Sequence, residues 1–279
     1  MTPIRRFVPE RFLNGLVYTR CMSRDALDRI AGRRDPMIPP TRLMFDGPRG
    51  IEIFRKNGEE FLDYFVRLAG LKPDDRVLDV GCGIGRKTLP LTRYLGVGSG
   101  YVGIDIVKTG VDWCRRRISS RFPDFRFEQV DVHNEHYNPK GRYRDFEFRF
   151  PFDDASFDFV VLGSVFTHML PAGVENYLSE IARVLAPGGR SLITYFLVND
   201  ESRALMEAGK SAYAMKPAGE NHRIADPSAP WLAVGFDETY IRNLYLGRGF
   251  SVVEPVHYGS WCGRERFTSF QDMIVARRP

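Results

Sequence analysis

The chain has 279 residues, of which 43% are hydrophobic and 13% aromatic, enough to bury the core of one large domain with appended segments. No stretch approaches the roughly 18 apolar residues that cross a bilayer, and the start lacks the apolar run of a secretory signal, so we expect a cytoplasmic protein without a membrane span. Four scattered cysteines without C-x-x-C spacing favour reduced thiols over a zinc site or a disulfide framework, and no metal is expected.

The first part of the chain is irregular. It is rich in arginine and contains Pro39-Pro40 and Gly47-Pro48, and we expect residues 1–57 to form an N-terminal cap or lid. The net charge of +5 and such arginine clusters would suit an anionic small-molecule partner. Residues 58–279 are then the main domain, interrupted by irregular insertions at 133–150 and 199–236, the second of which we also assign to the lid.

From about residue 61 onward, short β-branched and aromatic runs alternate with helix-like stretches, a pattern that predicts an α/β domain with a mainly parallel sheet. The clearest helix, between the fourth and fifth strands, has one apolar face and should end at Pro187, which cannot continue the ladder of hydrogen bonds. That face consists of Val174, Tyr177, Leu178, Ile181 and Leu185. The seven expected strands are 76–80, 101–106, 125–130, 157–162, 190–198, 251–257 and 272–276.

The first strand runs into a glycine-rich turn, VLDVGCGIG, at residues 77–85. Gly81 and Gly83 suit a turn against which a ligand presses, and a helix starting near residues 84–86 would point free N–H groups at an anion. Asp79 could receive a ligand ammonium group beside this turn. In a dinucleotide fingerprint the position of Arg86 would hold a small residue, so the spacing disfavours a nicotinamide enzyme, although it leaves that alternative open.

Two further acids follow strands in the expected order. Asp105 would end the second strand, where its carboxylate can accept hydrogen bonds from ribose hydroxyls, and Ile106 would form an apolar wall for adenine. Asp131, after the third strand, could accept from the adenine amine, while the N–H of Val132 could donate to a ring nitrogen. An acid at the end of the second strand also occurs in NAD enzymes, so it does not decide the cofactor by itself.

Taken together, these segments resemble the class I S-adenosylmethionine-dependent methyltransferase superfamily, from about residue 57 to the C-terminus. The matching segments are VLDVGCGIG, GIDI, DVHNEHYNPKG, FPFDDASFDFVVLGSVFTHM, EIARVLAPGG and FQDMIVA. The resemblance implies a Rossmann-like seven-stranded sheet in the order 3-2-1-4-5-7-6 with an antiparallel seventh strand, and S-adenosylmethionine as cofactor. It also implies that Cys82, Arg86 and Ser164 join the acids and glycines above at the methyl-donor site.

The acceptor is predicted from the segment after the fourth strand. His168, in VLGSVFTHM, lies near the sheet edge where ligands of open α/β folds bind, and it is our candidate general base; a structural role is the alternative. That segment lacks the N/D-P-P-Y/F tetrapeptide typical of enzymes that methylate exocyclic amines, which argues against nucleic acid. The resemblance extends to bacterial saccharide and natural-product methyltransferases, so we expect O-methylation of a saccharide hydroxyl. Transfer to nitrogen or carbon, and a non-catalytic cofactor-binding module, remain alternatives.

Overall fold

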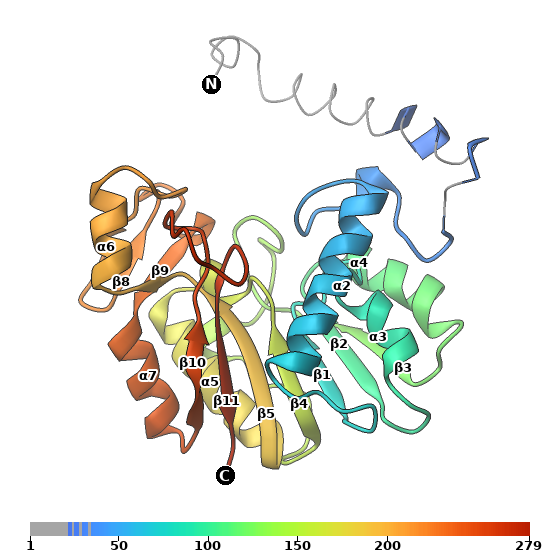
Figure 1. Ribbon diagram of the computed structural model, residues 1–279. Coiled ribbons are helices and arrows are strands. Elements are labelled where there is room, and N and C mark those ends of the chain that lie inside the picture. The colour runs from blue at the N-terminus through green and yellow to red at the C-terminus, as the bar shows by residue number, and fades with distance from the viewer. Residues whose placement is uncertain (1–21, 24, 28–29, 33–34) are drawn as a thin grey trace.

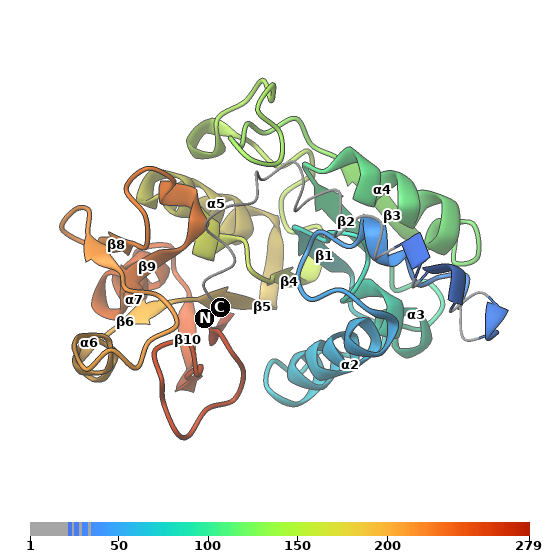
Figure 2. The ribbon, with the colours of Figure 1, turned by 90° about the horizontal axis from the view of Figure 1, so that it is seen from above.

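The computed structural model describes residues 22–23, 25–27, 30–32 and 35–279. Part of the expected N-terminal cap, including Arg5, Arg6 and Cys21, therefore lies outside the described residues. The described chain forms a twisted sheet with helices packed on both faces, and a smaller second sheet beside one edge (Figures 1 and 2).

The main sheet confirms the predicted fold class and strand order. Its seven strands lie in the order β10-β11-β5-β4-β1-β2-β3, which is 3-2-1-4-5-7-6 when these strands alone are numbered along the chain. Strand β11 runs antiparallel to both of its neighbours, while the others pair in parallel. The strands are β1 (Val77–Val80), β2 (Tyr101–Asp105), β3 (Phe125–Gln129), β4 (Phe157–Leu162), β5 (Leu185–Tyr195), β10 (Ser251–His257) and β11 (Asp272–Arg277).

Side chains of successive strand residues point to opposite faces of the sheet, and in the central strands most of these residues are apolar. Both faces of the sheet therefore pack against apolar cores. In β4, Phe159 and Val161 pack into the core beneath α2, α3 and α4, whereas Val160 and Leu162 pack into the core beneath α5 and α7. These helices are α2 (Ile51–Arg67), α3 (Thr88–Tyr94), α4 (Lys108–Cys114), α5 (Pro171–Val184) and α7 (Glu238–Gly247). The expected boundary at residue 57 falls inside α2.

The structure corrects two boundaries around β5. The apolar face of α5 is buried as predicted from Val174 to Ile181, but Leu185 already belongs to β5, where it pairs with Phe157. At the other end β5 stops at Tyr195, and Leu197–Val198 (β6) leaves for the second sheet. The N–H of Leu197 donates to the Asp272 carboxylate at 2.7 Å, which diverts the chain out of the main sheet.

The insertion at 199–236 is also more regular than expected. It contains α6 (Asp200–Glu207), β7 (Lys216–Pro217), β8 (His222–Ile224), the 3-10 helix η6 (Pro230–Leu232) and the start of β9 (Val234–Asp237). Strands β6, β9, β8 and β7 form the second sheet, in that order.

Short helices complete the described chain, and none of its helices is long and apolar enough to cross a membrane. They are η2 (Thr41–Leu43), the π-helical η3 (Arg115–Ser119), η4 (Asp145–Glu147) and η5 (Phe166–His168).

Candidate functional site

The glycine turn connects β1 to α3 at the carboxyl edge of the sheet. Gly81, Gly83 and Gly85 all have positive φ, at 79°, 60° and 87°, a region that favours glycine. A Cβ on Gly81 would lie 2.4 Å from the Val165 side chain, so the turn packs directly against the segment after β4. Because of this backbone path α3 begins only at Thr88, later than the sequence predicts.

Behind the turn, Asp79 and Lys87 form a buried ion pair. Asp79 is completely buried, accepts the Tyr101 hydroxyl at 2.9 Å and lies 3.6 Å from Lys87 Nζ. Lys87 Nζ also donates to the Gly81 carbonyl at 3.0 Å. Burial alone would lower the pKa of Lys87, but Asp79 and the other surrounding carboxylates raise it, so the ammonium stays charged. Asp79 thus acts on the site through Lys87 and is not exposed to a ligand.

In front of the turn lies a carboxylate that sequence analysis missed. Asp46 accepts the Ile84 N–H at 3.2 Å and an Arg86 N–H at 3.1 Å. Arg86 also donates to the Pro48 carbonyl and lies over the Phe54 ring. Its Nε and Nη1 atoms are buried without a hydrogen-bond partner in the part of the chain that the structure describes.

Asp105 ends β2 as predicted and holds the glycine turn through a hydrogen bond. Its carboxylate accepts the N–H of Gly83 and of Val107, each at 2.7 Å. Burial raises the pKa of Asp105 to about 6, even though both hydrogen bonds favour the ionised form.

A cavity of about 350 Å³ opens between these elements. Predicted residues that line it are Gly81, Gly83, Arg86, Asp105, Ile106, Val132, Ser164 and His168. Three other predicted residues do not: Asp79 and Cys82 are fully buried behind the turn, and Asp131 is exposed. Most of the remaining lining is apolar, including Phe45, Phe61, Val130, Val165, Met169 and Tyr177.

His168, on η5, also lines this cavity. Its Nδ1 lies 2.9 Å from the carbonyl oxygen of Trp231, on η6, so a proton on Nδ1 would leave Nε2 free to accept one. Burial lowers the pKa of His168 below 6.5, which keeps the imidazole neutral. The insertion at 199–236 thereby contributes directly to the orientation of the candidate base.

The insertion at 133–150 adds a second titratable group that sequence analysis missed. Asp145 lines the cavity, and burial raises its pKa above the ordinary value. Tyr137 lines the cavity as well, and its ring lies 6.1 Å from that of Phe45. No periodic pattern indicates that Asp145 or Asp46 would reach the site, because both lie in irregular segments.

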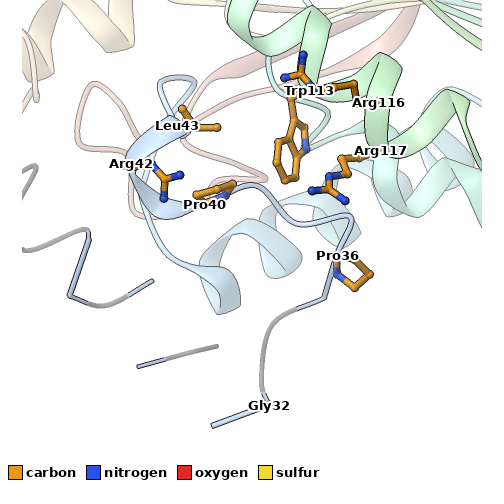
Figure 3. A pocket seen from close by; sticks show the side chains of 8 residues that line it. All are labelled: Gly32, Pro36, Pro40, Arg42, Leu43, Trp113, Arg116 and Arg117. Atoms are coloured by element: carbon orange, nitrogen blue, oxygen red, sulfur yellow. The ribbon is translucent and has the colours of Figure 1, made fainter. Parts of the chain in front are cut away.

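A second cavity, of about 490 Å³, lies between Gly32 and residues 36–43 on one side and the helices α4 and η3 on the other (Figure 3). Trp113 and Arg117, from α4 and η3, face Pro40 and Leu43 there. Among the described residues, no histidine or carboxylate lines this cavity, so the first cavity is the better candidate for a site with acid–base groups.

Known proteins resemble the part of the chain that carries the glycine turn. Residues 78–193, from β1 through most of β5, match the family model described as a methyltransferase domain. The "Phthiotriol/phenolphthiotriol dimycocerosates methyltransferase 1" of Mycobacterium ulcerans is 37% identical over 59% of this chain and 51% of its own length. The "Fatty-acid O-methyltransferase" of Mycolicibacterium smegmatis is 34% identical over 45% of this chain and 36% of its own length. The chain thus spans about half of the first relative's length and about a third of the second's.

Among solved structures, the magnesium protoporphyrin IX methyltransferase of Synechocystis PCC 6803, determined with bound SAH (S-adenosylhomocysteine), covers 85% of this chain and 92% of its own. The TM-score is 0.52 at 16% identity, a likeness that concerns the fold. The match of residues 78–193 and the shared fold both agree with the class I methyltransferase resemblance and with S-adenosylmethionine as the cofactor. The nicotinamide alternative receives no support.

Proposed function

We propose that this chain, with its methyltransferase domain at residues 78–193, transfers the methyl group of S-adenosylmethionine to a hydroxyl group of a small apolar or amphiphilic molecule. The observation that carries the proposal is a single cavity that is lined by the glycine turn, by Asp105 and by His168. Bound there, the cofactor supplies an already activated methyl group. The protein's main task is then alignment, which can contribute roughly 7–11 kcal/mol to lowering the barrier.

The residues around the turn fit such a cofactor. Asp105 offers carboxylate oxygens to ribose hydroxyls, and Ile106 and Val132 flank it with apolar surface for adenine. Arg86 carries two buried N–H-bearing atoms without partners, which suit the carboxylate of the amino-acid part.

A hydroxyl acceptor must lose a proton during the transfer, and we assign that proton to Nε2 of His168. A neutral imidazole is needed for this role, and its lowered pKa and the contact of Nδ1 with the Trp231 carbonyl both favour one. We accordingly propose that residues 199–236, which include Trp231, belong to the lid over the acceptor.

The lining of the cavity argues for an apolar acceptor and against the saccharide expected from the sequence. Phe45, Phe61, Met169 and Tyr177 offer large apolar surfaces, whereas a saccharide needs several polar partners. The names of both relatives described above also refer to lipids.

The test is incubation with S-adenosylmethionine and a panel of long-chain alcohols, phenols, quinols, saccharides and amines, with mass spectrometry of released SAH and of the methylated product. We expect an O-methylated product from an apolar hydroxyl compound. Transfer to saccharides alone would reverse the choice of acceptor, transfer to an amine or a ring carbon would reverse the choice of atom, and absence of transfer to any compound would reject the activity.

A further inference from the structure

The loop between η2 and α2 places a carboxylate inside the glycine turn. Asp46 Oδ2 accepts the Ile84 N–H at 3.2 Å, and Oδ1 accepts from Arg86 Nη2 at 3.1 Å. A Cβ on Gly83 would lie only 2.3 Å from Asp46 Oδ2, so glycine at this position leaves the room that the carboxylate occupies.

The groups that hold Asp46 are the anion-binding groups of the turn. On the other side of the turn, the Lys87 ammonium donates a hydrogen bond to the Gly81 carbonyl at 3.0 Å. The protein thus places its own carboxylate and its own ammonium where an amino-acid ligand would present the same two charges. We propose that Asp46 is a built-in competitor of the donor's carboxylate, and that donor binding requires Asp46 to leave Ile84 and Arg86. This inference rests on the proposed function, because it takes the amino-acid part of S-adenosylmethionine as the ligand of the turn.

Arg86 is built to exchange one carboxylate for another. Its side chain is only 6% exposed and lies over the Phe54 ring, 4.8 Å from the centroid, so the guanidinium is fixed in place. A buried guanidinium left without a counter-ion is strongly unfavourable, and an internal carboxylate prevents that state while the donor is absent. The unpartnered Nε and Nη1 atoms offer an incoming carboxylate a place to bind before Asp46 has fully left.

The loop contains glycines that would let it change its path. Gly47 and Gly50, with φ of 123° and 134°, flank Asp46 on its C-terminal side and suit a hinge. Met44 on the other side is fully buried and stays in the core. Room is also needed, because a cavity of about 350 Å³ is at the lower end of the range for one small ligand, roughly 300–1,000 Å³, and the reaction requires two.

The test compares the calorimetric affinity for SAH of the wild type, of Asp46→Asn and of the matched control Glu52→Gln. SAH carries no sulfonium charge, so the general loss of a negative charge has little effect on its binding. Glu52 is exposed at the start of α2, so its replacement by glutamine removes the same charge without affecting the glycine turn. We expect Asp46→Asn to bind SAH roughly tenfold more tightly, since a charge-assisted contact no longer has to be broken, and Glu52→Gln to bind like the wild type.

A second ligand separates competition for the carboxylate from simple obstruction. 5′-Methylthioadenosine lacks the amino-acid part, so its affinity should be the same for the wild type and for Asp46→Asn. Equal tightening for both ligands would mean that the loop only obstructs the cavity, and would overturn the inference. Unchanged or weaker binding of SAH by Asp46→Asn would overturn it too, the latter indicating that Asp46 holds the donor's ammonium. Failure of the wild type to bind SAH at all would instead reject the proposed function.

Discussion

The buried pair of Asp79 and Lys87 should couple the stability of the fold to the donor site. Asp79 is completely buried and Lys87 is only 7% exposed, so neither charge is compensated by water. Replacing Asp79 by asparagine leaves the ammonium with the Gly81 carbonyl as its nearest acceptor. Breaking a buried pair in this way costs about 3–5 kcal/mol, and we expect a loss of that order in the free energy of unfolding.

Lys87→Met should cost a similar amount, because it keeps the length of the side chain and leaves the carboxylate with only the Tyr101 hydroxyl among the hydrogen bonds described. The double variant Asp79→Asn, Lys87→Met contains no unpaired buried charge. It should therefore be less destabilised than either single variant, which is the signature of a coupled pair in a double-mutant cycle.

The assay is urea unfolding of all four proteins at pH 7, monitored by far-UV circular dichroism. The unfolding midpoints are compared at a common dependence of the unfolding free energy on urea concentration. A double variant whose loss equals the sum of the two single losses would refute the reasoning. It would show that the two residues stabilise the turn independently, and that the distance of 3.6 Å between the charged atoms carries no coupling energy.

Three further outcomes are expected. His168→Ala should lower turnover by roughly 10²–10⁴-fold while the affinity for SAH stays unchanged, and unchanged turnover would remove His168 from the mechanism. In the wild type, kcat/KM should rise with pH through the pKa of His168, which lies below 6.5, and then stay level. Calorimetry should show SAH affinity weakening as pH falls through about 6, where Asp105 gains a proton, and Asp105→Asn should abolish this dependence. Gly83→Ala would put a methyl group into the crowded glycine turn, and it should nearly abolish SAH binding. The control Gly188→Ala also has a positive φ, of 76°, but its Cβ would have no atom within 4 Å, so it should lower the free energy of unfolding by only about 1–2 kcal/mol.

The main sheet could be predicted because its central strands β1, β2 and β4 are buried on both faces and consist mostly of apolar residues. The positions of Gly83 and Asp105 at the cavity could be predicted for a related reason. They come directly after strands, and the carboxyl ends of parallel strands meet at one edge of the sheet. The second sheet was missed because β7 and β8 have only two and three residues, too few for an alternating pattern to show.

Asp46 and Lys87 illustrate two other limits of the sequence. Asp46 reaches the turn from 38 positions away, out of a segment without helical or strand periodicity. Lys87 is adjacent to the predicted Arg86, yet the sequence does not show that its side chain turns back behind the glycines to Gly81. Both positions depend on the path of the backbone, which the positive φ angles of the turn determine.

The two halves of the cavity differ in what supports them. The part of the cavity that we assign to the donor is formed by residues that follow β1 and β2. The part that we assign to the acceptor includes Asp145 from one insertion and His168, whose Nδ1 contacts the Trp231 carbonyl of the other insertion. The indole N–H of Trp231 donates to Glu135 at 3.1 Å, so the two insertions also contact each other. A change in either insertion can therefore alter the acceptor and the orientation of His168 while the glycine turn and Asp105 keep their geometry. This separation explains why the motifs identify the methyl donor, whereas the acceptor has to be inferred from the lining of the cavity.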